Sequence, residues 1–546
     1  MKAKHTATIG RLVLLVTLIA CSLSLHAQTN LTGIWRVEGS GTSFPWTLIL
    51  HMDGNELTGT VRTCSSQELA SDIRDSVING STIQFKCTSN DGNRTITLNG
   101  TVKGDTIDFG WQKETKPGAS PFPRDGMFGA LAPPRFTAKK ISDSTRPDPS
   151  SASVAMQKLL DAHNYPEFAR QLPDAGGMTP EEGAYFRGVL ASLQGRFSEA
   201  VRPLISAVNT HDYSLTSYQV ERAIEILGDI ATRMFRYGDA VQMYDDVDRI
   251  FGARMGGAIG PVRQKRAVAA SLQNVPAQTI QIAGDFTLKK TGLEYPISID
   301  GKTFSAVLDT GASFSIVSES TAKKWGITPM SATVTFNGYG SGEFSAHPAV
   351  LPVLQIGKAE LHNVAVFITA DQNLILAGAI LGCPVTSALG RLTFDRDQAL
   401  TVSAASPRAD ADGGVALWAG YSSLLVSVNT KPGGNSPGVF VLDTGSLSTY
   451  LTQRFLEEHR SDFPAKPDDS ARLAGAGGVH VIPAYAANRL PLWFGSTPAL
   501  LNGQHILAES QGGEVENYQG LIGEDVLRQF SGYTIDYRTM RFSVTP

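Results

Sequence analysis

The sequence has few cysteines and no cluster of residues with metal-binding spacing. Only four cysteines occur among 546 residues, and three of them follow residue 27. No Cys/His group has the spacing of a zinc site, so we expect neither a metal nor another cofactor. Cys64 and Cys87 lie in one short region and could form a disulfide in an oxidising compartment; two half-buried strand residues are the equal alternative. We expect the Cys383 thiol to be buried and unreactive.

The chain also lacks an excess of basic residues. It has 47 lysines and arginines against 51 acidic residues, which gives a formal net charge of -4. Nucleic acids and acidic lipid surfaces select strongly basic patches, so we expect neither as a partner. The hydrophobic share of 42% and the charged share of 18% are those of a soluble globular protein.

A long apolar run occurs near the amino terminus, after three basic residues. It reads "LVLLVTLIACSLSL" and is followed by the Ala-x-Ala-like site "LHA" at Ala27. This pattern predicts a signal peptide over residues 1–27, because the run is too short to be a comfortable transmembrane span. The stretch "LIAC" also resembles a bacterial lipobox, in which Cys21 would become a lipid anchor. We favour cleavage after Ala27. The protein is then periplasmic or secreted, with a membrane-anchored lipoprotein as the alternative.

Composition divides the amino-terminal half into three zones. At about 150 residues per domain, the chain should hold three or four domains. Residues 28–112 contain short strand-like runs separated by turns such as "DGNE" and "NGST", which predicts a small β-barrel or sandwich. Its opening "TGIW" resembles that of lipocalin-like barrels. Residues 113–150 are rich in Pro, Ser and Gly, and we expect a linker there.

Residues 151–275 change to a helical period. The segments "YFRGVLASLQGRFSEAVRPLISAV" and "AIEILGDIATRMFRYGDAVQMYDDV" place apolar residues at i, i+3, i+4 and i+7. Gly188 and Gly228 occupy corresponding positions, and each is followed by small or apolar residues at the same offsets. This resembles tetratricopeptide repeats, in which small residues let paired helices approach closely. The segment should either bind a protein partner or serve only for packing between neighbouring helices.

The rest of the chain reads as two related halves, over 278–405 and 413–546. Val-Leu-Asp-Thr-Gly appears at 307–311 and again at 441–445. Each copy continues with a short helix and a glycine-rich hairpin. Each then reaches two apolar residues and a glycine, "ILG" at Gly382 and "LIG" at Gly523. A single Asp-Thr-Gly is a common turn, but its recurrence with the same landmarks indicates a site that needs two carboxylates.

These paired landmarks resemble the pepsin/retropepsin family of aspartic proteases, most closely the bacterial retropepsin-like kind. The resemblance implies a two-lobed, all-β protease with Asp309 and Asp443 as its catalytic pair. In such a pair one carboxyl group activates water and the other protonates the carbonyl oxygen, and the two share a proton. Which residue takes which role stays open at this point.

The resemblance also implies supporting roles around the pair. Thr310 and Thr444 would brace the two copies, Gly311 and Gly445 would permit the tight turns, and Ser313 and Ser446 would hydrogen-bond the carboxylates. Gly382 and Gly523 would support the loops that carry the aspartates. The candidate flap residues, which would cover a bound substrate, are Tyr339, Gly340 and Gly477.

We therefore predict an exported, multidomain, mainly β protein. It has a small β-barrel or sandwich, a short helical repeat segment and a two-lobed aspartic endopeptidase that hydrolyses peptide or protein substrates. The alternative function is a non-catalytic scaffold that binds a peptide or protein through the protease-like cleft and the helical repeats. A further alternative keeps the enzyme but pairs each Asp-Thr-Gly copy with one from another chain.

Overall fold

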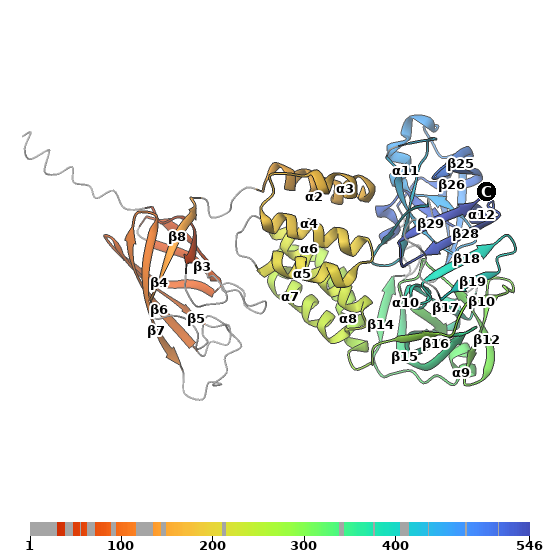
Figure 1. The fold of residues 1–546 in the computed structure, drawn as a ribbon, viewed down its shortest axis with the longest axis horizontal. Helices are drawn as coiled ribbons and strands as arrows, with labels where there is room; N and C mark the ends of the chain where they lie inside the picture. The colour runs from red at the N-terminus through yellow and green to blue at the C-terminus, as the bar shows by residue number, and fades with distance from the viewer. Residues whose placement is uncertain are drawn as a thin grey trace, which may run out of the picture. The chain divides into compact units, whose positions relative to one another are not determined.

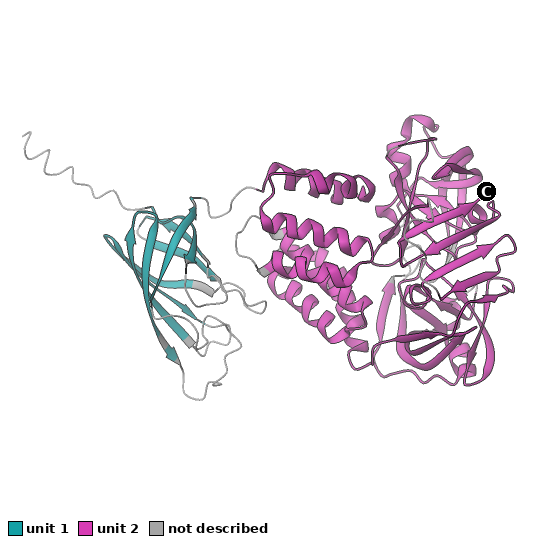
Figure 2. Cartoon of the chain, viewed as in Figure 1, with its two compact units in different colours: residues 1–148, 209–214 teal, residues 149–208, 215–546 magenta. Residues whose placement is uncertain are grey.

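The computed structural model forms two compact units, which Figure 2 colours separately. Unit 1 comprises residues 1–148 and 209–214, and unit 2 comprises the remaining residues. The signal peptide, Cys21 and Cys64 lie outside the described residues, so cleavage, lipidation and the disulfide stay predictions. The structure describes residues 30–38, 47–54, 56–62, 71–88, 94–115, 135–143, 149–209, 215–337, 343–374, 377–404, 414–434, 436–475, 478–510 and 513–546.

Unit 1 contains a closed barrel whose strands are neighbours in chain order. The barrel closes because the first strand pairs antiparallel with both the second and the last. Large side chains, among them Trp35, Phe85 and Phe109, are fully buried and fill its interior together with Cys87. The strands are β1 (Gly33–Glu38), β2 (Thr47–Asp53), β3 (Glu56–Arg62), β4 (Ser71–Asn79), β5 (Thr82–Thr88), β6 (Arg94–Lys103), β7 (Thr106–Thr115) and β8 (Arg135–Ser142).

The barrel extends beyond residue 112, into the segment that composition predicts as a linker. Strand β8 alternates in burial, with Phe136 and Ala138 facing the core. A segment rich in proline and glycine separates β8 from β7 in the sequence. The short strand is therefore isolated from the other strand signals, and its period of two is hard to recognise.

Unit 2 begins with a run of helices, shown in amber to yellow-green in Figure 1, in which α6 packs against α7 and α7 against α8. A Cβ atom added at Gly188 would lie 2.6 Å from Cγ of Leu204, and one at Gly228 would lie 2.6 Å from Cε1 of Tyr244. The two glycines thus permit the close approach that the sequence predicts. The tetratricopeptide likeness itself stays a prediction. The helices are α2 (Ser151–Asp161), α3 (Tyr165–Gln171), α4 (Pro180–Leu193), α5 (Phe197–Asn209), α6 (Ser217–Arg233), α7 (Tyr237–Met255) and α8 (Gly260–Leu272).

The first Asp-Thr-Gly copy follows the helices and forms an eight-stranded sheet in the order β14-β15-β11-β12-β17-β13-β16-β9. Its elements are β9 (Thr279–Ile282), β10 (Phe286–Leu288), β11 (Tyr295–Ile299), β12 (Lys302–Leu308), β13 (Ser315–Ser318), α9 (Glu319–Trp325), β14 (Val334–Asn337), β15 (Glu343–Ile356), β16 (Ala359–Thr369), β17 (Ala379–Leu381), α10 (Cys383–Ala388), β18 (Arg391–Asp395) and β19 (Leu400–Ser403).

The second copy repeats this order of elements from β12 onward, and its strands belong to a thirteen-stranded sheet. Its elements are β20 (Val415–Ala419), β21 (Leu424–Val428), β22 (Gly438–Leu442), β23 (Tyr450–Leu451), α11 (Gln453–Glu458), β24 (Asp469–Gly475), β25 (Gly478–Phe494), β26 (Thr497–Leu507), β27 (Gly520–Ile522), α12 (Glu524–Leu527), β28 (Gly532–Asp536) and β29 (Arg541–Thr545).

The two copies are joined by a sheet to which both contribute strands. β18 of the first copy pairs antiparallel with β28 of the second. Thr393 lies opposite Thr534 with their hydroxyl oxygens 3.1 Å apart, and Arg391 forms a salt bridge of 3.1 Å with Asp536. The buried side chains on both sides of this junction belong to one hydrophobic core. The equivalent ends of the copies therefore meet within a single chain.

Among the helices in the described part of the chain, none is both long enough and apolar enough to cross a membrane.

Candidate active site

The two Asp-Thr-Gly segments are held by the same backbone arrangement. Strand β12 runs parallel to β17, and β22 runs parallel to β27. The chain leaves β12 at Asp309, whose N–H donates to the carbonyl of Leu381 at 3.0 Å. Asp443 leaves β22 and donates to the carbonyl of Ile522 at the same distance. Each aspartate is thus anchored to a neighbouring strand at the point where its own strand ends.

The glycines that follow β17 and β27 leave room for these loops. A Cβ atom at Gly382 would lie 2.6 Å from the carbonyl oxygen of Ala312, and one at Gly523 would lie 2.9 Å from that of Ser446. Both contacts are closer than a real Cβ atom tolerates, so the backbone of each loop passes where a side chain would be. This is the physical reason for glycine after the two apolar residues in both copies.

The two threonines cross between the copies. The Thr310 N–H donates to Oγ1 of Thr444, and the Thr444 N–H donates to Oγ1 of Thr310, both at 3.2 Å. Each hydroxyl in turn donates to a carbonyl before the opposite aspartate, Thr444 to Leu308 at 2.7 Å and Thr310 to Leu442. Thr310 and Thr444 are buried, so four otherwise orphaned backbone groups are satisfied across this junction.

The carboxyl groups of Asp309 and Asp443 meet above the threonines; together they are called the dyad below. Gly311 N–H donates to Oδ1 of Asp309 at 2.6 Å, and Gly445 N–H donates to Oδ1 of Asp443 at 2.8 Å. Each glycine also lies against the opposite carboxyl group. A Cβ atom at Gly311 would be 2.5 Å from Cγ of Asp443, and one at Gly445 would be 2.5 Å from Cγ of Asp309.

The electrostatics of the dyad are asymmetric. Burial raises the pKa of both carboxyl groups, and a hydrogen bond joins them. That hydrogen bond lowers the pKa of Asp309, whereas it and the neighbouring Asp309 charge raise the pKa of Asp443. Two carboxylates in contact cannot both ionise easily, so they retain one proton between them. The upward shift of the pKa is larger for Asp443, because it feels the Asp309 charge in addition to burial.

Ser446 differs from what the resemblance implies. The Ser446 hydroxyl donates to the carbonyl of Ser448 at 3.0 Å, so its single proton does not serve a carboxylate. The backbone N–H of Ser446 donates to Oδ1 of Asp443 instead, at 2.9 Å. Ala312 is its counterpart in the first copy and donates a backbone hydrogen bond to Asp309. Ser313 lies one residue further on and lines the cavity described next.

The predicted flap residues Tyr339, Gly340 and Gly477 lie outside the described residues, so their part in covering a substrate stays a prediction. The strands on either side of these residues in the sequence are described, and they pair antiparallel, β14 with β15 and β24 with β25.

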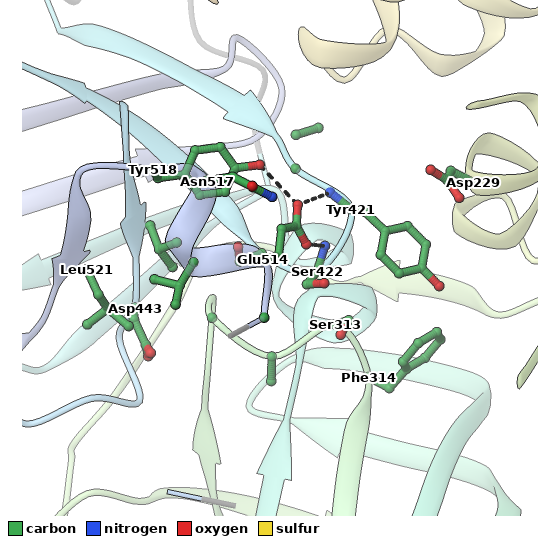
Figure 3. A pocket seen from close by; sticks show the side chains of 18 of the residues that line it. Asp229, Ser313, Phe314, Tyr421, Ser422, Asp443, Glu514, Asn517, Tyr518 and Leu521 are labelled. Atoms are coloured by element: carbon green, nitrogen blue, oxygen red, sulfur yellow. Dashed lines mark hydrogen bonds between the residues drawn. The ribbon is translucent and has the colours of Figure 1, made fainter. Parts of the chain in front are cut away.

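Both aspartates are partly exposed, and they face a cavity of about 1490 Å³. One wall comes from the two Asp-Thr-Gly copies, including Phe314 and Leu521. The opposite wall comes from the helical segment and includes Asp229 of α6. Figure 3 shows Asp443 and Leu521 on one side, Ser313 and Phe314 below, and Asp229 on the far side. The sequence does not predict the helical wall, because nothing local in α4, α6 or α8 distinguishes a cavity-facing side from a packed one.

A loop at 420–423 also supports the site, and the sequence does not single it out. Directly after it, the Leu424 N–H donates to the Thr310 carbonyl at 3.0 Å. Glu514 accepts hydrogen bonds from the N–H groups of Tyr421 and Ser422, at 3.1 and 2.8 Å, as Figure 3 shows. Arg233 of α6 donates to the carbonyls of Gly420 and Tyr421. The loop is therefore held from the helices and from the second copy at once.

The Cys383 thiol lies below the dyad and is buried, as predicted. It donates to the Thr310 carbonyl at 3.3 Å, and burial raises its pKa to about 12. A thiol with this pKa is no nucleophile near neutral pH. Within the described residues, no group of three or more His, Cys, Asp or Glu side chains is placed to hold a metal ion.

One segment of the chain is similar to aspartyl proteases. Residues 295–391 match the family described as "Aspartyl protease"; this segment contains Asp309 and Gly382, and Asp443 lies outside it. A solved retropepsin-like aspartic protease from Rickettsia conorii aligns at 17% identity over 23% of this chain and 94% of that chain, with a TM-score of 0.17. No curated protein matches the chain.

Proposed function

We propose that the protein is an aspartic endopeptidase whose catalytic residues are Asp309 and Asp443. The observation that carries this proposal is that the crossed hydrogen bonds of Thr310 and Thr444 bring two equivalent Asp-Thr-Gly loops together, with each glycine directly against the opposite carboxyl group. Such a pair offers a base and an acid side by side, which is what peptide hydrolysis requires when no metal or side-chain nucleophile takes part. Because both loops come from one chain, a second copy of the chain is not needed.

The asymmetry of the dyad suggests the roles. Asp309 takes a proton from water, whose oxygen attacks the peptide carbonyl carbon. Asp443 gives its proton to the carbonyl oxygen, so a neutral tetrahedral diol forms without an isolated oxyanion. Its carbon–nitrogen bond then breaks as Asp309 returns a proton to the leaving nitrogen and Asp443 recovers one from the diol. Thr310 and Thr444 hold the two loops in register, and the backbone N–H groups of Gly311 and Gly445 orient the carboxyl groups.

The proposal extends to the whole chain. The enzyme is exported, either periplasmic or secreted, and Cys21 is the site of a lipid anchor if the lipobox is used. The lipocalin-like barrel and the tetratricopeptide-like segment belong to the same protein as accessory parts that position a protein substrate.

The test is incubation of the mature protein with a mixed peptide library over acidic to mildly alkaline pH, with cleavage followed by mass spectrometry. Asp309→Asn and Asp443→Asn are measured beside it, and an equimolar mixture of the two variants tests pairing between chains. We expect cleavage by the native protein and none by either variant or by the mixture. Intact peptides throughout, from a protein with native circular dichroism, would favour a binding scaffold instead.

A further inference from the structure

The helical segment forms one side of the cavity that contains the dyad. Side chains of α4, α6 and α8 line it, among them Val189, Ile226 and Val268. The cavity of about 1490 Å³ is larger than the roughly 300–1,000 Å³ of ordinary small-ligand pockets. Its lining includes both aspartates of the dyad and residues of α4, α6 and α8. An occupant would thus touch the protease copies on one side and the helices on the other.

The helices are attached to the second copy through aromatic packing. Tyr165, at the start of α3, is buried against Trp418 and Tyr518, with ring centroids 6.0 and 6.5 Å away. The three rings belong to a hydrophobic cluster that also contains core residues of the second copy. Arg454 of α11 donates to the carbonyl of Ala162, between α2 and α3. Such a contact resembles the interior of a domain more than a surface that opens easily.

The helices are attached to the first copy at their other end. Val268 and Leu272 of α8 pack with Val334 and Phe344, which belong to the hairpin strands β14 and β15. The side chain of Gln264 donates to the carbonyl of Thr335 at 2.9 Å. Figure 1 shows α8 beside β14. The helical segment therefore bridges both copies across the cavity.

A buried charge network stiffens this bridge. Lys265 of α8 lies 2.7 Å from Glu225 and 3.0 Å from Asp229, both on α6. Tyr244 of α7 donates to Asp229 at 2.8 Å. The Lys265 ammonium also lies 3.8 Å from the ring centroid of Tyr421, in the loop that supports Thr310. Separating the helices from the second copy would break this contact and the hydrogen bonds of Arg233, so the wall is fixed rather than hinged.

We infer that the helical segment is a permanent wall of the substrate site. We also infer that the substrate is a flexible polypeptide that enters the cavity by a free end. This inference rests on the proposed function, and it names the substrate class of that site. An exposed loop of a folded protein has no free end. It must be laid into the cavity from the side, and residues of α4, α6 and α8 line the side that faces the dyad.

The experiment compares one peptide sequence in two forms. Immobilised Asp309→Asn is incubated with a peptide library, and the peptide retained most strongly is identified by mass spectrometry. That sequence is then prepared as a linear peptide and as a surface loop grafted into a small folded host domain. A nonspecific serine protease that cuts both forms shows that the grafted loop is accessible.

Two quantities are measured for each form: kcat/KM with the native protein, and the dissociation constant with Asp309→Asn by fluorescence anisotropy. We expect the linear form to be preferred at least tenfold in both, since each 1.4 kcal/mol of local unfolding needed to admit a loop costs about a factor of ten. Tyr165→Leu, which loosens the wall from the second copy, should reduce this preference. Phe168→Leu on the same helix, whose ring packs inside the helical segment, should leave it unchanged.

Equal cleavage and equal binding of the two forms by the native chain would overturn the inference even if Tyr165→Leu does not fold. Preferential binding of the linear form without cleavage would retain the inference while the proposed catalysis fails. Failure of Asp309→Asn to retain any peptide, with no cleavage by the native protein, would overturn both.

Discussion

Replacing Thr444 by valine tests whether the crossed threonines hold the dyad together. The hydroxyl of Thr444 accepts from the Thr310 N–H at 3.2 Å and donates to the Leu308 carbonyl at 2.7 Å. Valine has nearly the same shape but offers neither interaction. Both backbone groups then stay buried without a partner, at a cost of about 1–3 kcal/mol each. We therefore expect Thr444→Val to lower the free energy of unfolding by about 2–6 kcal/mol.

The matched control is Thr444→Ser, which keeps the hydroxyl and loses one methyl group. Its expected cost is about 1 kcal/mol, from the apolar burial of that methyl. Differential scanning calorimetry of the two variants should show the valine form melting several degrees below the serine form, because about 2 °C or more is lost per kcal/mol in a domain of this size. The measured difference isolates the hydroxyl from the change in packing.

Activity should follow the same order. A displacement of about 1 Å between catalytic groups can cost about a hundredfold in rate, so kcat of Thr444→Val should fall by that order while Thr444→Ser stays near the native value. Equal melting temperatures of the two variants, or a native kcat in Thr444→Val, would show that the junction is held by packing alone.

Three further predictions follow from the site. Gly311→Ala should abolish activity, because its Cβ would lie 2.5 Å from Cγ of Asp443, whereas Gly238→Ala on α7, with no atom within 4 Å of the new Cβ, should retain it; peptide cleavage rates decide. The proton shared by the dyad should persist above the usual carboxyl pKa of 3.8, so the alkaline limb of kcat/KM should lie above that pH; a limb at or below 3.8 would contradict the assignment. Arg233→Met should lower kcat and change KM little, because it removes the hydrogen bonds to the carbonyls of the loop beside Thr310. The control Arg236→Met removes an exposed ion pair with Asp239 and should change neither kcat nor KM.

The Asp-Thr-Gly loops could be predicted from the sequence because their requirements are local and occur twice. A strand must end at Asp309 and at Asp443, a glycine must follow two residues later, and another must follow the two apolar residues near Gly382 and Gly523. Each requirement demands one residue type at a fixed position in the sequence. Because the pattern occurs twice, chance is a poor explanation for it. The paired helices could be predicted for the same reason, since Gly188 and Gly228 recur in matching surroundings.

The contact of Arg233 with the loop and the orientation of Ser446 could not be predicted from the sequence. Arg233 and Gly420 are 187 positions apart, and an arginine that donates to two carbonyls looks the same in sequence as one in solvent. Ser446 illustrates a different limit. A serine after Asp-Thr-Gly suggests a hydroxyl contact to the carboxylate, but the turn brings the backbone N–H there first and directs the hydroxyl to Ser448.

The connection between the helices and the dyad runs through Thr310. Its carbonyl accepts from the Leu424 N–H, and the loop before Leu424 is held by Arg233 from the helices and by Glu514 from the second copy. Its hydroxyl and N–H cross to the Thr444 loop. The helical segment thus contributes in two ways, as the far wall of the cavity and as one support of the loop beside the dyad. Deleting residues 151–275 would remove both, and it would expose the apolar faces of Trp418, Tyr518, Val334 and Phe344 to water. The two Asp-Thr-Gly copies and the helices therefore form one structural unit.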